Sequence, residues 1–255
     1  MANLGRTLGI VRSLVIYHAI PLRQRRLRRL YRQFVRPGDV AFDVGAHAGN
    51  RTRALAAIGC RVVAVEPQAD LARMLRRFFR RTSSVTVLEA LMSAHEGHQT
   101  LFVSNRNPTV ATAAAEWREA RASDPEWTGV EWDTSINVRS TTLDAAIAGF
   151  GEPAFIKIDV EGFEPTVLAG LSRPIRTISF EYLPSALSQV EECAARLASL
   201  GAYEYNWSPG ETFTLASKRW MTAADLVSAL KTPAAQRRSG DVYARLILAD
   251  VGLDR

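Results

Sequence analysis

Acidic residues follow apolar, strand-like runs at several points of the 255-residue chain. Asp43 lies near the end of the first such run, 40–44, and two glycines, Gly45 and Gly49, come soon after it. Glycines at a turn of this kind let a ligand approach the backbone, and the helix expected after them presents free N–H groups. Because open α/β sheets bind ligands at the carboxyl ends of their strands, this stretch predicts a nucleotide pocket.

The spacing of the glycines separates two kinds of cofactor. A dinucleotide site needs the pattern G-x-G-x-x-G, whereas only Gly45 and Gly49 are present here, and an acid precedes them. That acid, Asp43, would repel a pyrophosphate but suits the ammonium and sulfonium charges of S-adenosylmethionine. Glu66 ends the next apolar run 23 residues later, near the ~20 expected for an acid that binds ribose hydroxyls. The pair predicts S-adenosylmethionine and disfavours an NAD-dependent oxidoreductase, although either acid alone fits a capping or solvated role.

A second group of acids has the residue types needed to activate an acceptor. Asp159 and Glu161 follow one apolar run, and Glu181 follows another. Methyl transfer to a hydroxyl requires a base or a metal ion, so these three are the predicted catalytic residues. Either one carboxylate takes the hydroxyl proton, or Asp159 and Glu181 hold Mg²⁺. Asp159 and Glu161 could instead have a structural role and cap the turn before Pro165. Lys157 is expected either to pair with a carboxylate or to extend its charged end out of the sheet.

The elements that must position these residues alternate along the chain. Apolar runs predict strands at 40–44, 61–66, 85–89, 99–103, 154–158, 175–180, 202–207, 212–216 and 241–248. Helical spacing of apolar residues, with its start and stop signals, predicts helices at 4–19, 22–35, 51–58, 71–79, 165–170, 187–200 and 222–230, and a short helix that opens at 142–144. This alternation predicts a doubly wound α/β domain. The turn after the third strand, at Ala90, then borders the ligand crevice and is expected to contact the adenine base.

The charge of the chain is concentrated in its first 36 residues. That segment holds nine arginines and no acid, which gives it a charge of +9. Because the whole chain has a net charge of +6, residues 37–255 together carry about −3. We expect residues 1–36 to be a basic helical arm and residues 37–255 to be the catalytic domain. The arm is either a solvated helix or a contact to an anionic surface, and the domain shows no strong nucleic-acid signal.

A long segment at about 104–137 interrupts the alternation and carries three tryptophans, which argue against disorder. A substrate-side lid and a structural flap are both consistent with it. Cys60 and Cys193 are expected to be core thiols of a reduced compartment. Because no secretory signal is evident, a cytoplasmic location is expected; the sequence leaves the oligomeric state open.

Two motifs, 43–49 (D-V-G-A-H-A-G) and 155–164 (F-I-K-I-D-V-E-G-F-E), make residues 37–182 resemble the FkbM-type methyltransferases. The resemblance implies a Rossmann-like class I methyltransferase fold with a seven-stranded, mostly parallel sheet flanked by helices. It also implies that Asp43, Gly45 and Gly49 hold the methionine part of the cofactor and Glu66 the ribose. His47 departs from the asparagine associated with its position, so either a cofactor contact or a packing role follows for it. The predicted cofactor-binding residues are Asp43, Gly45, Ala46, His47, Gly49, Glu66, Pro67 and Ala90.

The resemblance further implies methylation of a hydroxyl oxygen on a sugar, glycan or natural-product acceptor. Two alternatives remain at this point. One is an RNA or protein methyltransferase that uses the basic arm, and the other is a non-catalytic module that binds the cofactor or a partner.

Overall fold

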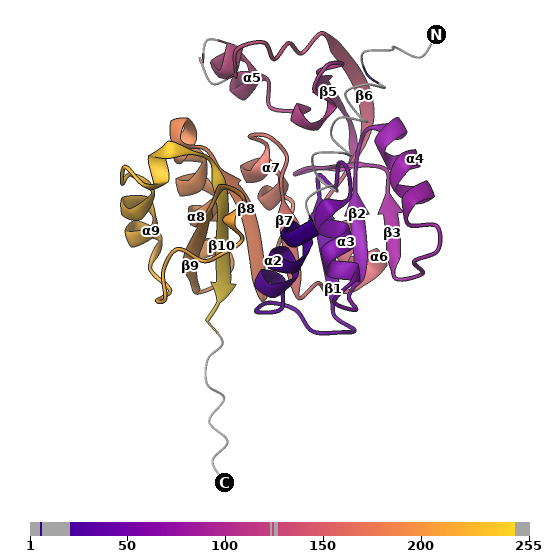
Figure 1. Ribbon diagram of the computed structural model, residues 1–255. Coiled ribbons are helices and arrows are strands. Elements are labelled where there is room, and N and C mark those ends of the chain that lie inside the picture. Colours follow the sequence, from indigo (N-terminus) through magenta and orange to yellow (C-terminus); the bar gives the residue numbers. More distant parts are fainter. Residues whose placement is uncertain (1–5, 7–20, 123, 125–126, 248–255) are drawn as a thin grey trace.

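A seven-stranded sheet forms the centre of the structure, a computed structural model that describes residues 6, 21–122, 124 and 127–247 (Figure 1). Its strand order is β3-β2-β1-β7-β8-β10-β9. The strands are β1 (Val40–Val44), β2 (Arg61–Val65), β3 (Val85–Leu88), β7 (Phe155–Ile158), β8 (Thr177–Tyr182), β9 (Tyr203–Pro209) and β10 (Gly240–Leu246). Only β10 runs antiparallel to its neighbours, β8 and β9. The predicted seven-stranded, mostly parallel sheet is therefore confirmed.

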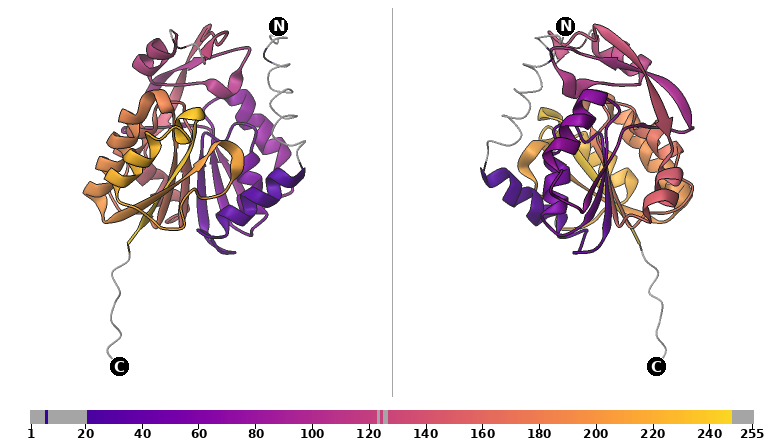
Figure 2. Two further views of the ribbon diagram at one scale, coloured as in Figure 1. Left: turned by 60° about the vertical axis from the view of Figure 1, so that its left-hand side comes forward. Right: turned by 90° about the vertical axis from the view of Figure 1, so that its right-hand side faces the viewer.

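Helices cover both faces of this sheet because its strands are buried on both sides. One face, which carries Ala41, Val62 and Ala64, packs against α2 (Pro21–Tyr31), α3 (Asn50–Ala56) and α4 (Ala69–Phe78). The opposite face, which carries Phe42 and Val63, belongs to the largest core cluster. That cluster includes residues of α6 (Leu143–Phe150), α7 (Glu164–Ala169), α8 (Leu187–Leu200) and α9 (Ala223–Leu230). Figure 2 shows the two helical layers on either side of the sheet.

A smaller, three-stranded sheet lies over the edge of the central sheet at which β1 ends (Figure 1). It consists of β4 (Leu91–Met92), β6 (Thr134–Thr141) and β5 (Gly97–Val103), in that order. A 3₁₀ turn, Pro108–Val110, and helix α5 (Ala115–Ala122) connect β5 to β6. The segment at about 104–137 thus contains a 3₁₀ turn, a helix and the start of β6. Most side chains of β6 are polar and only partly buried, so the apolar alternation that marks a strand is weak.

Two other expectations differ from the structure. Residues 212–216 form no strand, because a 3₁₀ turn, Gly210–Thr212, is followed by Phe213 in the left-handed region with φ 53°. Strand β8 extends through Tyr182, so Glu181 lies inside the strand and not after it. The predicted helix 4–19 lies outside the described residues, apart from Arg6.

Several local predictions are confirmed. Thr142 caps α6 through the N–H of Ala145, and Thr222 caps α9 through the N–H of Asp225. Cys60 and Cys193 are buried and unbridged. Within the described part of the chain, no helix combines the length and apolar character needed to cross a bilayer.

Candidate active site

The turn after β1 requires glycine at two positions. Gly45 has φ +79°, and a Cβ atom there would lie 1.9 Å from the carbonyl oxygen of Asp159. Gly49 has φ +74° at the start of α3, where a Cβ atom would lie 2.8 Å from Leu75 Cδ2. Both glycines therefore serve conformation and close packing, and they bring the backbone of the turn against the end of β7.

Asp43 is buried beneath this turn with 1% of its surface exposed. Its Oδ2 accepts a hydrogen bond from Thr52 Oγ1 at 2.5 Å, whereas Oδ1 has no partner among the described residues. Burial raises the pKa of Asp43, opposed by the Thr52 hydrogen bond and the charge of Arg51. A buried carboxylate oxygen without a donor is satisfied by an ammonium group, so Asp43 fits the charge expected of the cofactor.

Glu66 follows β2 and is fully buried. Its two oxygens accept the backbone N–H groups of His47 and Gln68, each at 3.0 Å. His47 adopts φ 45°, a left-handed conformation that directs its N–H toward this carboxylate. Each oxygen keeps a further lone pair for a hydroxyl donor. One narrow pocket is lined by Glu66, Pro67 and Ala90. This agrees with the expectation that Glu66 contacts the ribose and Ala90 the adenine base.

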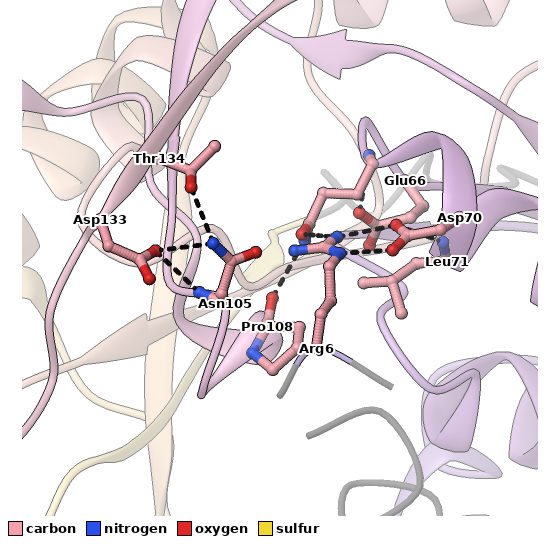
Figure 3. Close-up of polar contacts among 9 residues, drawn as sticks. Arg6, Glu66, Asp70, Leu71, Asn105, Pro108, Asp133 and Thr134 are labelled. Atoms are coloured by element: carbon pink, nitrogen blue, oxygen red, sulfur yellow. Dashed lines mark hydrogen bonds and ion pairs between the residues drawn. The ribbon is translucent and has the colours of Figure 1, made fainter. Parts of the chain in front are cut away.

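A chain of polar contacts closes this pocket from the outside (Figure 3). Arg6 donates to both carboxylate oxygens of Asp70, at 2.5 and 2.7 Å, and to Gln68 Oε1 at 2.9 Å. Gln68 Nε2 in turn donates to the carbonyl oxygen of Pro108 at 3.0 Å. Gln68, which is 1% exposed, therefore connects Arg6, Glu66 and the insertion.

A second, more open cavity of about 240 Å³ lies beside the glycine turn. Its wall includes five carboxylates and one arginine, Arg51. The carboxylates come from different parts of the chain: Asp159, Glu161, Glu181, Glu211 and Asp241. Thr109 and Val110 contribute to the wall from the insertion, and Ala111 and Ala113 line the narrow pocket, so the insertion borders both spaces.

Buried cations balance part of this negative charge. Lys157 is fully buried, and its Nζ lies 2.7 Å from Asp241 Oδ1 and 3.9 Å from Asp159 Oδ2. Arg51 Nη1 lies 3.0 Å from Asp159 Oδ2, and Nη2 lies 3.9 Å from Asp241 Oδ1. Burial raises the pKa of Asp159, but the charges of Lys157 and Arg51 outweigh this and hold it below its usual value. Asp159 therefore stays ionised, and the expected pairing of Lys157 with a carboxylate is confirmed.

Glu161 and Glu181 have the opposite environment. One oxygen from each, together with one from Asp159, lies within 4.8 Å of the others. Burial raises the pKa of Glu161 well above its usual value, and repulsion by Asp159 and Glu164 raises it further. Burial also raises the pKa of Glu181 well above its usual value, and repulsion by Glu161 and Asp159 raises it further. The cluster thus combines one carboxylate that is held ionised with two acids whose pKa values are raised.

The tryptophans of the insertion form its core and brace the acidic turn. Trp117 packs against Trp127 and Trp132, with ring centroids 4.9 and 5.9 Å apart. A Cβ atom on Gly162, beside Glu161, would lie 2.2 Å from the Trp117 ring. None of the three tryptophans contributes to the cavity wall formed by described residues. Their contacts are those of a structural brace.

The structure brings all three predicted catalytic acids into one cavity and lines the adjoining pocket with Gly45, His47, Glu66, Pro67 and Ala90. Asp43 lies beneath the turn and lines neither space, and Ala46 borders the open cavity. Sequence reasoning missed Arg51, Asp241 and Gln68. Asp241 pairs directly with Glu181 across β10 and β8, a contact that only the antiparallel register reveals.

The doubly wound sheet, the glycine turn after β1 and the acids at β1 and β2 together define an S-adenosylmethionine-dependent methyltransferase of class I architecture. Residues 43–206 match the model of the methyltransferase FkbM domain, and the chain belongs to this family. No curated protein matches the chain in sequence.

Two solved structures illustrate the similarity. Precorrin-6y C5,15-methyltransferase from Geobacter metallireducens is 13% identical with a TM-score of 0.46, over 87% of this chain and 86% of that one. A SAM-dependent O-methyltransferase from Thermotoga maritima is 12% identical with a TM-score of 0.43, over 90% of this chain and 66% of that one.

Proposed function

We propose that the protein methylates a hydroxyl oxygen of an uncharged, hydroxyl-rich acceptor such as a sugar, glycan or natural product. The observation that carries this proposal is the acidic wall of the open cavity beside the glycine turn. Carboxylates accept hydrogen bonds from several hydroxyl groups at once. The same wall would repel a phosphate, and its single arginine, Arg51, is already paired with Asp159. This argues against an RNA acceptor.

The residues around the turn fit the cofactor. Asp43 would favour the positive charge of the cofactor from beneath the turn, and Glu66 would accept the ribose hydroxyls. Gly45, Ala46, His47 and Gly49 would shape the backbone around the methionine part, and Pro67 and Ala90 would border the nucleoside. Bound S-adenosylmethionine supplies an electrophilic methyl group and carries its own leaving group. The protein then has to orient the acceptor and remove one proton.

Glu161 and Glu181 are the proposed bases. Their pKa values are raised by burial and by repulsion from neighbouring carboxylates, and a carboxylate whose pKa is shifted upward toward the working pH is a more effective base. The acceptor hydroxyl would donate to one of these carboxylates while its oxygen forms the new bond to the methyl carbon. Asp159, held ionised by Lys157 and Arg51, would orient the acceptor by accepting a second hydroxyl hydrogen bond.

A version with a metal ion uses the same residues. Carboxylate oxygens are the ligands that Mg²⁺ prefers, and Asp159 and Glu181 would hold the ion. Its effect would be to lower the pKa of a hydroxyl close to it. The two versions differ in one measurement, because only the second loses activity when EDTA is added and regains it with Mg²⁺.

The test begins with calorimetric titration of S-adenosylmethionine into the wild-type protein and an Asp43→Asn variant. We expect binding that the variant weakens. Release of S-adenosylhomocysteine is then measured with neutral glycosides, polyketide alcohols, RNA and a protein extract as acceptors. Turnover only with RNA or protein would replace the proposed acceptor class. Absence of binding by folded wild-type protein would count against the cofactor assignment itself.

A further inference from the structure

The helical layer formed by α2, α3 and α4 is strongly basic. Residues 21–84 contain 15 arginines and only four acids. Asp43 and Glu66 are buried, whereas Asp39 and Asp70 are paired with Arg176 and Arg6. The described part of this layer therefore exposes no unpaired carboxylate to offset the arginines.

Many of these arginines point into solvent. On α2 and directly after it, four arginines are exposed and form no ion pair with a described residue: Arg25, Arg26, Arg29 and Arg32. Their spacing of three and four residues places them along one side of the helix, while Leu27 and Leu30 pack into the core. Arginines this close repel one another, so the surface is suited to an anionic partner.

The end of α4 adds an apolar side chain to this basic layer. Phe78 is 49% exposed, one of only two large apolar side chains so exposed in the described residues. Arg76, Arg77 and Arg80 flank it in sequence and are themselves exposed. An aromatic ring among arginines is typical of surfaces that rest on lipid headgroups, where the ring enters the acyl boundary and the cations bind anionic lipids.

We propose that the layer of α2, α3 and α4 docks on an anionic membrane surface. The arrangement of charge favours lipid over nucleic acid. An RNA bound along this layer would have to bring its backbone to the cavity beside the glycine turn, whose wall is acidic. Of the arginines in residues 21–84, only Arg51 reaches that wall. Figure 2 shows the three helices side by side on one face of the sheet, a broad surface that a bilayer can contact at once.

Vesicle flotation tests this proposal with the full chain. The probes are phosphatidylcholine vesicles with and without phosphatidylserine, at low and high salt. The variant combines Arg25→Gln, Arg29→Gln, Arg32→Gln, Arg73→Gln and Arg77→Gln. Each arginine near such a surface contributes roughly a fivefold change in partitioning, so we expect a loss of a hundredfold or more. Phe78→Ser alone should weaken binding about tenfold, from the apolar area withdrawn.

A matched control removes exposed arginines elsewhere on the molecule, Arg106→Gln, Arg139→Gln and Arg173→Gln. It should float as the wild type does. Circular dichroism checks that each variant is folded. Failure of the wild type to bind phosphatidylserine vesicles, or equal losses in the control, would overturn the proposal. Salt-sensitive binding to RNA with none to vesicles would overturn it as well, and would assign the layer to nucleic acid.

Discussion

Replacing Lys157 by methionine tests whether buried charge pairs hold the acidic wall together. The Lys157 Nζ atom is 2.7 Å from Asp241 Oδ1, which corresponds to ~6 kcal/mol of attraction at an effective dielectric constant of about 20. Much of that offsets desolvation, and losing one partner of a buried pair typically costs about 3–5 kcal/mol. Because Arg51 remains 3.9 Å from the same oxygen, we expect a loss of stability at the low end of this range, about 3 kcal/mol. For a chain of this length that lowers the melting temperature by about 6 °C.

Urea unfolding at pH 8 and pH 5 measures this loss. In the wild type, the lowered pKa of Asp159 stabilises the fold above the pKa of the unfolded chain, and that stability is lost as pH falls through the folded-state pKa. Without Lys157, the pKa of Asp159 rises, so protonation relieves the unpaired charge at a higher pH. The deficit of the variant should therefore be largest at pH 8 and smaller at pH 5.

Two further variants complete the experiment. Lys218→Met removes an exposed lysine and should change the free energy of unfolding by no more than about 0.5 kcal/mol. Adding Asp241→Asn to Lys157→Met removes an unpaired charge and should recover part of the lost stability. A Lys157→Met deficit below about 1 kcal/mol, or one that is equal at both pH values, would refute the idea that this network is held by charge.

Three other changes probe the cofactor pocket and the acceptor cavity. Gly45→Ala places a Cβ atom 1.9 Å from a backbone carbonyl oxygen, so S-adenosylmethionine binding measured by calorimetry should be lost; retained affinity would contradict the tight turn. Glu161→Gln and Glu181→Gln should each lower the initial rate by about 10²- to 10⁴-fold while cofactor affinity stays unchanged. Because the pKa of both acids is raised, the wild-type rate should still increase with pH above the range in which an ordinary glutamate loses its proton, and a flat profile would exclude them as bases. Gln68→Ala removes the side-chain hydrogen bonds to Arg6 and Pro108 beside the pocket and should weaken cofactor binding about fivefold, whereas exposed Gln33→Ala should leave it unchanged.

The central sheet and the two acidic clusters were predictable because each rests on a local pattern. Apart from Asp43, the run 40–44 is apolar on both faces, as expected of a buried parallel strand. The turn at Gly45 and the acid at 66 follow from spacing along the chain. The insertion was less predictable, since most residues of β6 are polar and Val138 is its one buried apolar side chain. Its stability comes from pairing with β5 and from packing of Trp117, neither of which is visible in a short window of sequence.

The charged partners of the predicted acids were missed for a related reason. Asp241 is about 80 residues from Asp159, and nothing in its own segment distinguishes it from a solvated strand start. It reaches the site because β10 inserts antiparallel between β8 and β9 and so places it opposite Glu181. Long-range register, not local propensity, determines which acids meet.

In the motif 157–161 (K-I-D-V-E), backbone geometry gives the two acids different surroundings. Lys157 and Asp159 are two residues apart on an extended strand, so their side chains lie on the same face, and the lysine holds the aspartate ionised. Glu161 comes after the strand has ended, with φ 54°. The carboxylate of Glu161 lies close to those of Asp159 and Glu181, and burial, followed by repulsion from neighbouring carboxylates, raises the pKa of Glu161 and of Glu181. One short sequence thus places a carboxylate with a lowered pKa beside an acid with a raised pKa, which is the separation of pKa values that the proposed acid–base chemistry requires.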